Sequence, residues 1–227
     1  MADGEAGAIC HESRSRSNRS VRVRIMQPAK PLTLARQACV RSMNRALFLD
    51  RDGIVNLDDG CTHRVDAFRF VPGTFDLCRA ATARGFALVI ATNQAGIGRG
   101  YYSEAEYRRF TAAMLAQFGA AGVAITAVYH CPFHPDGTGP YGCEHPWRKP
   151  NPGMLRDAVR TLGLDLAASI AIGDGARDIE AARRAGIGTA VRVAAPGAPD
   201  RGAGAPDAVL DSVGAALAWF AARYRGR

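Results

Sequence analysis

The sequence predicts an α/β fold, in which a parallel sheet is covered by helices on both faces. Short apolar runs recur along the chain, separated by segments of helical length, at residues 46–49, 86–91, 169–172 and 189–193. Strands buried on both faces are near-continuous apolar runs, and their alternation with helices gives right-handed β-α-β units and a parallel sheet. A chain of 227 residues with 48% hydrophobic content can also form one domain with a sizeable core.

The individual elements are expected from the apolar runs and from residues typical of helix boundaries. Pro72-Gly73 precedes the first helix, and Ser103 with Glu106 forms a capping box at the start of the longest one. The expected strands are 46–50, 86–92, 124–129, 169–172, 189–193 and 207–210, and the expected helices are 74–84, one from 103, one from 152, 178–185 and 213–224. Because no stretch is long enough for a separate cap domain, loops would have to hold a substrate.

Residues 1–44 differ in composition from the rest of the chain. They are rich in Arg and Ser, contain no apolar core segment and carry a net charge of +5, out of a formal net charge of +8 for the whole chain. This leader resembles a transit peptide or a disordered arm, or it precedes a true start at Met43. The remainder is close to balanced in charge, so we expect a monomeric domain over 45–227 without nucleic-acid or membrane partners. Six cysteines without the spacing of a small disulfide scaffold indicate a reducing cytoplasm.

Two aspartates, Asp50 and Asp52, lie in Asp50-Arg51-Asp52-Gly53, directly after the first apolar run. Ligands of open α/β sheets bind at the carboxyl ends of the strands, where this motif falls. Alternation along the strand would place the two carboxylates on the same side, with Arg51 turned away. Two carboxylates this close repel each other unless a cation or a shared proton lies between them. Gly53 allows the tight turn that such a strand end needs.

Three further motifs follow, two of them at the ends of later apolar runs. They are Thr92-Asn93-Gln94 with the glycine-rich turn 95–100, then Arg148-Lys149-Pro150, then Gly173-Asp174. With the aspartate motif, this order resembles the haloacid dehalogenase (HAD) superfamily of phosphoryl-transfer enzymes. The resemblance covers about residues 45–215 and implies a Rossmann-like HAD fold without a separate cap domain.

Finer features resemble one branch of that superfamily. These are Gly60-x-x-His63, Pro72-Gly73 and a Cys/His loop ahead of Arg148-Lys149-Pro150. The branch contains D,D-heptose 1,7-bisphosphate phosphatases and histidinol phosphatases.

The resemblance implies roles in phosphoryl transfer for five residues. Asp50 would be the nucleophile that forms an aspartyl-phosphate, and Asp52 would protonate the leaving oxygen and later activate water. Thr92 would orient the phosphoryl group, with help from Asn93. Lys149 would stabilise the negative charge of the transition state.

The resemblance also implies an Mg²⁺ site made of oxygen ligands. Asp50, the main-chain carbonyl of Asp52 and the carboxylate of Asp174 would hold the ion. Asp178 would cap or support this loop. The branch usually has Lys after the motif aspartate, whereas Gly175 stands here, so one stabilising contact is expected to be absent.

A structural zinc site is expected less directly from the Cys/His loop. The branch normally binds zinc through Cys-x-His and Cys-x-Cys, but Phe133 occupies the first histidine position here. A tetrahedral set remains chemically reasonable, and its ligands would be Cys131, His134, Cys143 and His145. The alternative is a loop without metal, held by prolines and Trp147.

These expectations lead to a Mg²⁺-dependent phosphomonoester hydrolase that acts on a small sugar phosphate. The favoured substrate is D-glycero-D-manno-heptose 1,7-bisphosphate, from which the 7-phosphate would be removed. A bisphosphate needs a second anion site, and Arg148, Arg99 and His63 fall on segments that end near the first. Histidinol phosphate is the alternative substrate. A non-catalytic binding module with a basic arm is the alternative from another class, and the intact set of catalytic residues argues against it.

Overall fold

The computed structural model describes residues 44–58, 60–194 and 205–224. The expected leader lies outside these residues apart from Asn44 and stays a prediction. The six strands form one parallel sheet in the order β3-β2-β1-β4-β5-β6. They are β1 (Arg45–Leu49), β2 (Phe86–Asn93), β3 (Ala127–Cys131), β4 (Ile170–Gly173), β5 (Thr189–Val193) and β6 (Ala208–Leu210).

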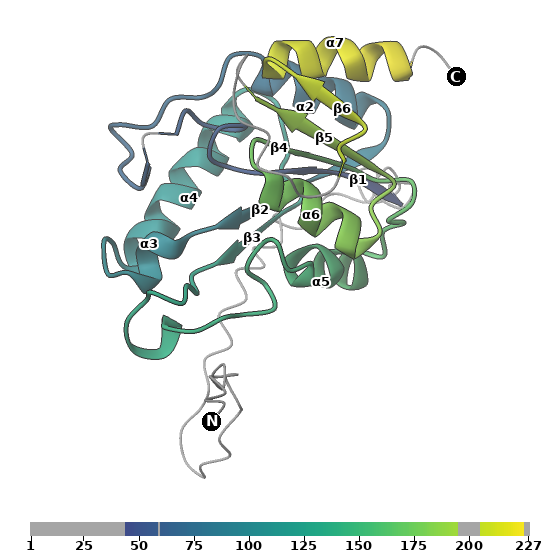
Figure 1. Ribbon diagram of the computed structural model, residues 1–227. Coiled ribbons are helices and arrows are strands. Elements are labelled where there is room, and N and C mark those ends of the chain that lie inside the picture. Colours follow the sequence, from purple (N-terminus) through teal and green to yellow (C-terminus); the bar gives the residue numbers. More distant parts are fainter. Residues whose placement is uncertain (1–43, 59, 195–204, 225–227) are drawn as a thin grey trace, which may run out of the picture.

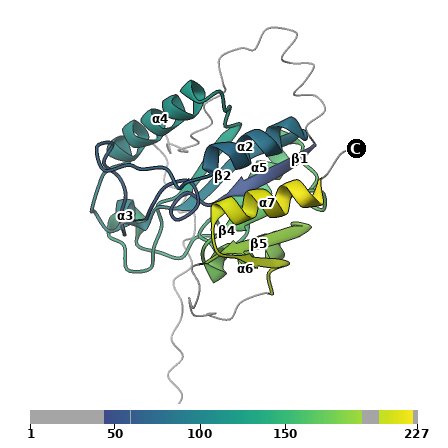
Figure 2. The ribbon, with the colours of Figure 1, turned by 90° about the horizontal axis from the view of Figure 1, so that it is seen from above.

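Helices cover both faces of this sheet (Figure 1). One apolar core joins the sheet to α2 (Thr74–Ala83), α4 (Glu104–Ala120) and α7 (Val213–Arg223), and a second core joins its other face to α5 (Gly153–Leu162) and α6 (Ala176–Ala185). Figure 2 shows α2 and α7 side by side across the first face. The predicted parallel α/β sheet with helices on both faces is therefore confirmed.

Most observed bounds differ from the expected ones by one or two residues, and the larger differences lie in β3 and in two segments expected to be loops. Strand β3 begins and ends later than expected, because its register with β2 runs from Val89 opposite Ala127 to Asn93 opposite Cys131. Two short helices, α3 (Ala95–Gly98) and η1 (Gly139–Tyr141), lie in segments expected to be loops. The predicted capping box of α4 is confirmed, with reciprocal hydrogen bonds between Ser103 and Glu106.

The order of the strands places a binding site at one edge of the sheet. From β1 the chain continues to β2 on one side, and it later returns to β4 on the other side of β1. The carboxyl ends of β1 and β4 therefore flank the point where the strand order reverses, which is the usual ligand position in open α/β sheets.

None of the helices among the described residues combines the length and apolar character needed to cross a membrane.

Candidate active site

Asp50 follows β1 at the point where the strand order reverses. Its main-chain N–H donates to the carbonyl of Ile172 in β4 (3.0 Å), and its side chain is 6% exposed. Among the described residues, Oδ1 accepts hydrogen bonds from Lys149 Nζ and from the N–H of Arg51, both at 2.8 Å. Oδ2 is therefore the oxygen available to a ligand.

Lys149 is buried against this carboxylate although it comes from the loop before α5. Nζ donates to Asp50 Oδ1 and to the carbonyl of Ala91 (2.8 Å), and it lies 2.5 Å from Asp178 Oδ1. Burial acts to lower the pKa of Lys149, but the carboxylates of Asp178 and Asp50 outweigh it and the net pKa is raised. The side chain is thus a fixed ammonium group at the centre of the site.

Three carboxylates gather around this ammonium group. Oxygens of Asp50, Asp174 and Asp178 lie within 4.8 Å of one another. Burial is the main cause that raises the pKa of Asp50 to about 7 and that of Asp174 to about 6, and Asp178 adds to both. The Asp174 carboxylate can lie close to the turn after β1 because residue 53 is a glycine (φ +81°). A Cβ at Gly53 would be 2.3 Å from Asp174 Oδ2.

The donor set fits a divalent cation that prefers oxygen. Asp174 Oδ1 is buried without a hydrogen-bond partner among the described residues, and such an atom is costly unless an ion or water satisfies it. A cation at this point would also offset the repulsion between the carboxylates. Asp178 supports the loop as expected, since its Oδ2 accepts from the N–H of Gly175 (2.9 Å).

Asp52 lies beside this cluster and is held by donors. Arg51 donates from Nε and Nη2 to Oδ1 and from Nη2 to Oδ2, at 2.8–3.0 Å. The expectation that Arg51 turns away is wrong. Its side chain is long enough to fold back into a buried position, where it lies over the Phe110 ring (4.8 Å) and donates to the carbonyl of Thr62.

Two residues of the Thr92 motif have different surroundings. Thr92 is buried, and its Oγ1 accepts from Gln94 Nε2 (2.9 Å). Asn93 exchanges two hydrogen bonds with the main chain of Lys149. Asn93 Nδ2 donates to the Lys149 carbonyl (2.9 Å), and the Lys149 N–H donates to Asn93 Oδ1 (3.0 Å). Asn93 therefore holds the Lys149 segment, and its expected contact with substrate stays a prediction.

Arg148 lies against the Cys/His loop. Arg148 is half-buried and donates to the carbonyl of Phe133 (3.2 Å). Burial lowers the pKa of Arg148, and the positive charges of Arg177 and Arg99 add to this effect. Arg99 contacts His134 and forms an ion pair with Asp136, and the expected role of Arg148 and Arg99 in substrate binding stays a prediction.

His63 has different contacts from those of Arg148 and Arg99. Its ring stacks on Tyr102 (centroids 4.6 Å apart), and none of the contacts among the described residues joins it to the arginines. Its expected role in substrate binding stays a prediction.

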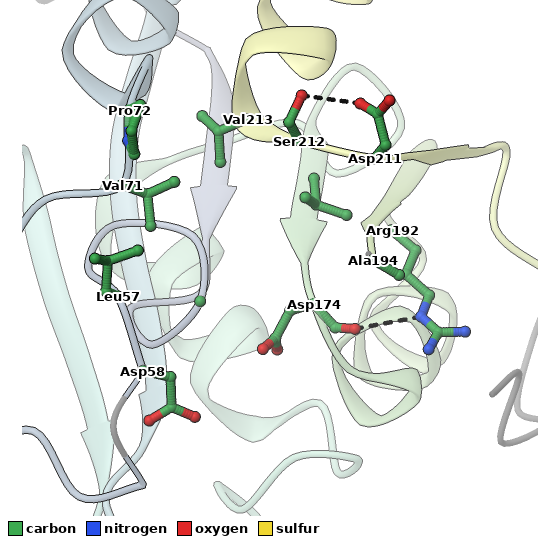
Figure 3. Close-up of a pocket in the computed structure, with 12 residues that line it drawn as sticks. Leu57, Asp58, Val71, Pro72, Asp174, Arg192, Ala194, Asp211, Ser212 and Val213 are labelled. Carbon is green, nitrogen blue, oxygen red and sulfur yellow. Dashed lines mark hydrogen bonds between the residues drawn. The ribbon is translucent and has the colours of Figure 1, made fainter. Parts of the chain in front are cut away.

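A pocket of about 490 Å³ adjoins Asp174 on the side of β5 and α7 (Figure 3). Arg192 donates from Nε to the main-chain oxygen of Asp174 (3.2 Å) and fixes that end of β4. Asp58, Asp174 and Asp211 line the pocket together with Arg192 and apolar side chains.

The four predicted zinc ligands are not gathered. Both ring nitrogens of His134 have other partners: Nδ1 accepts from the N–H of Asp136 (3.0 Å) and Nε2 lies 2.9 Å from Arg99 Nη2. Within the described part of the chain, three ligand atoms come within 4.8 Å of one another at the aspartate cluster alone. The residues as arranged do not fit a Cys₂His₂ zinc site, so this arrangement does not support the zinc expected from the sequence.

Aromatic stacking holds the same loop. The His145 ring lies flat on Phe133, with centroids 3.9 Å apart and planes at 5°, and His145 Nδ1 accepts from the N–H of Trp147 (3.1 Å). Burial raises the pKa of the Cys131 thiol to about 11, so a thiolate is disfavoured there.

Sequence reasoning missed several residues of this site. Gln94 and Asn56 donate to Asp52, Tyr102 donates to Gln94, and the positive charge of Arg177 acts on Arg148. Gln94 carried a signal, because it directly follows Thr92-Asn93. The others depend on contacts between distant segments, which no local pattern reveals.

Comparison with known proteins finds hydrolases and phosphatases that are similar to this chain. The profile of the HAD-hydrolase-like family matches residues 146–216. A D-glycero-alpha-D-manno-heptose-1,7-bisphosphate 7-phosphatase of Burkholderia mallei is 48% identical over 66% of this chain and 80% of its own length. A D-glycero-beta-D-manno-heptose-1,7-bisphosphate 7-phosphatase of Yersinia pestis is 43% identical over 79% of this chain and 97% of its own length.

A solved structure is also similar to this chain. It is a D,D-heptose 1,7-bisphosphate phosphatase from B. bronchiseptica, complexed with magnesium and phosphate. It superposes with a TM-score of 0.64 and 29% identity, over 79% of this chain and 99% of that one.

Proposed function

Because this chain belongs to the HAD-like hydrolase family and is a phosphatase, we propose that it removes one phosphate from a sugar bisphosphate, with D-glycero-D-manno-heptose 1,7-bisphosphate as the substrate and its 7-phosphate as the group released. The printed activities of the relatives support this substrate. The observation that carries the proposal is the buried contact between Asp50 and Lys149, with the half-buried Arg148 directly before this lysine.

The chemistry begins at Asp50. Its Oδ2 attacks phosphorus while Lys149 holds Oδ1, and the bond from phosphorus to the sugar oxygen breaks. The sugar oxygen takes a proton from Asp52. The resulting aspartyl-phosphate is hydrolysed by a water that gives a proton to Asp52, which releases inorganic phosphate and restores Asp50.

Asp50, Asp174 and the main-chain carbonyl of Asp52 are the residues that would hold Mg²⁺. When bound, the ion neutralises the carboxylates and offers positive charge to the phosphoryl oxygens. Lys149 adds a fixed positive charge beside the nucleophile. Because the side chain is only 4% exposed, water screens this charge little. Thr92 donates its hydroxyl hydrogen toward the same oxygens.

The arginines supply the second anion site that a bisphosphate needs. The positive charges of Arg177 and Arg99 act unfavourably on that of Arg148, so a phosphate placed beside Arg148 relieves this repulsion and gains charge-assisted hydrogen bonds. A monophosphate with a neutral remainder leaves the arginines unused.

Steady-state kinetics on a small substrate panel test the proposal. We expect kcat/KM for the heptose bisphosphate to exceed that for histidinol phosphate clearly. Losing one charged phosphate contact costs about 1.5–3 kcal/mol, so Arg148→Ala should lower kcat/KM for the bisphosphate about 10–100-fold. The same variant should leave p-nitrophenyl phosphate nearly unaffected.

Arg160→Ala is the matched control, because Arg160 is an exposed arginine of α5 that pairs with Asp157. It should change neither substrate's kinetics. Equal losses on both substrates with Arg148→Ala would place Arg148 in the reaction centre instead. A preference for histidinol phosphate would overturn the substrate assignment.

A further inference from the structure

A buried chain of hydrogen bonds reaches the site from α3 and the turn before α4. Tyr102 Oη donates to Gln94 Oε1 (2.6 Å), and Gln94 Nε2 donates both to Asp52 Oδ2 (3.0 Å) and to Thr92 Oγ1 (2.9 Å). Gln94 is 2% exposed and Tyr102 is 6% exposed. Water therefore does not compete for these hydrogen bonds.

The amide of Gln94 can adopt one orientation only. When Asp52 is ionised, as it is when it activates water, its carboxylate has no proton to donate, so the amide group facing it is NH₂. The opposite orientation would place two acceptors, Oε1 and Asp52 Oδ2, against each other, and the Tyr102 hydroxyl would then accept from the amide instead of donating to it. Burial raises the pKa of Tyr102, so its hydroxyl keeps the proton that it donates to Oε1.

This orientation determines where the hydrogen of the Thr92 hydroxyl points. A hydroxyl has one hydrogen to donate and two acceptor positions. Since Gln94 occupies one acceptor position of Thr92 Oγ1, the hydroxyl hydrogen remains available for a phosphoryl oxygen. One side chain thus orients the carboxylate that moves protons and the hydroxyl that binds phosphate.

The backbone is shaped to receive the tyrosine ring. A Cβ at Gly96 would lie 2.2 Å from Tyr102 Cε1 and 2.9 Å from its hydroxyl oxygen. The absence of a side chain at Gly96 therefore lets the ring approach the turn closely. His63 stacks on the ring and limits its movement further.

We infer that Gln94, held in one orientation by Tyr102, is a positioning residue that sets the geometry of both Asp52 and Thr92. The inference deepens the proposed function, and it rests on the roles given there to these two side chains. Neither Gln94 nor Tyr102 contacts the phosphoryl group itself. Their effect should therefore appear in kcat more than in KM.

The experiment measures kcat, KM and thermal unfolding for Gln94→Leu, Tyr102→Phe and the double variant, on p-nitrophenyl phosphate with Mg²⁺. Gln94→Leu removes the hydrogen bond to a charged group and should lower kcat about 10–100-fold. Tyr102→Phe removes one neutral hydrogen bond and should lower kcat about 2–10-fold, with KM nearly unchanged in both. Tyr101→Phe is the control, because Tyr101 is 60% exposed, and it should match the unmodified protein.

The double variant separates positioning from a structural role. Gln94→Leu leaves the Tyr102 hydroxyl buried without an acceptor, so Tm should fall. Adding Tyr102→Phe removes that hydroxyl, and Tm should recover while kcat stays at the level of Gln94→Leu. A further fall in kcat would show that Tyr102 acts independently of Gln94. Recovery of kcat together with Tm would reduce the chain of hydrogen bonds to a structural role. Either result overturns the inference.

Asp52→Asn, measured in parallel, separates this inference from the proposed function. Turnover by Asp52→Asn at the level of the unmodified protein would refute the role of Asp52 and, with it, the positioning inference. An inactive Asp52→Asn beside a fully active Gln94→Leu would refute the positioning role alone.

Discussion

Replacing Lys149 with Met should produce a loss of stability that depends on pH. The side chain keeps its approximate length and loses its charge, so Asp50 and Asp178 lose their buried ammonium partner. Removing one partner of a buried ion pair typically lowers the free energy of unfolding by 3–5 kcal/mol. We expect the lower end, about 3 kcal/mol at pH 7.5, because the carboxylates can take up protons instead. For a domain of this size, that corresponds to a Tm lower by about 6–12 °C.

The sign of the pH dependence follows from proton uptake. Without the ammonium group, the carboxylates in the folded variant bind protons more tightly than those in the unmodified protein. The difference in the free energy of unfolding between the two proteins must therefore shrink as pH falls. At pH 5 we expect a Tm difference less than half of that at pH 7.5, and a kcat at pH 7.5 lower by about 10²–10³-fold.

Thermal unfolding in EDTA at the two pH values provides the measurement, and Arg160→Met is the control. Arg160 is exposed on α5, so its loss should change stability by no more than about 0.5 kcal/mol at either pH. An equal Tm loss for Lys149→Met at pH 5 and pH 7.5 would refute the reasoning, because the effect would then come from packing rather than charge.

Three further predictions concern the carboxylates and the Cys/His loop. Asp50→Asn should abolish turnover and keep the fold, and residual activity above a few per cent would contradict the covalent mechanism. Asp174→Asn should raise the Tm of the metal-free protein at pH 7.5 but not at pH 4. Its folded pKa of about 6 lies above the ordinary 3.8, so the free-energy cost of burying Asp174 builds up as pH rises from the ordinary value to the folded value, and it is fully present at pH 7.5. Protein purified without chelator should contain far less than one zinc per chain, as elemental analysis would show, because the Phe133–His145 stack holds the loop.

Much of the site could be predicted because the motifs sit where strands end. The apolar runs locate β1, β2 and β4, and a parallel sheet brings the residues after them to one edge. Asp50, Thr92 and Asp174 were therefore expected together. Lys149 was placed by resemblance alone, since its segment follows a loop and no local pattern fixes where it docks.

The remainder depends on contacts that sequence patterns do not describe. Alternation along a strand predicts the direction of the Cβ atom of Arg51, but the long side chain folds back onto Asp52 and Phe110. Helix α3 contains two glycines in four residues, which local propensity assigns to a turn. The hydrogen bond from Tyr102 to Gln94 exists only because Gly96 lets the ring approach.

Detection of the covalent intermediate tests the central claim, that Asp50 is the nucleophile, most directly. Asp52→Asn would be mixed with p-nitrophenyl phosphate and Mg²⁺ and quenched in acid. This leaving group needs little protonation, whereas hydrolysis of the intermediate still needs a base, so the phospho-enzyme should accumulate. Mass spectrometry of peptides should then find one phosphoryl group on Asp50, and no phosphoryl group in the Asp50→Asn/Asp52→Asn variant. A phosphoryl group on another residue, or none at all during turnover, would contradict the mechanism.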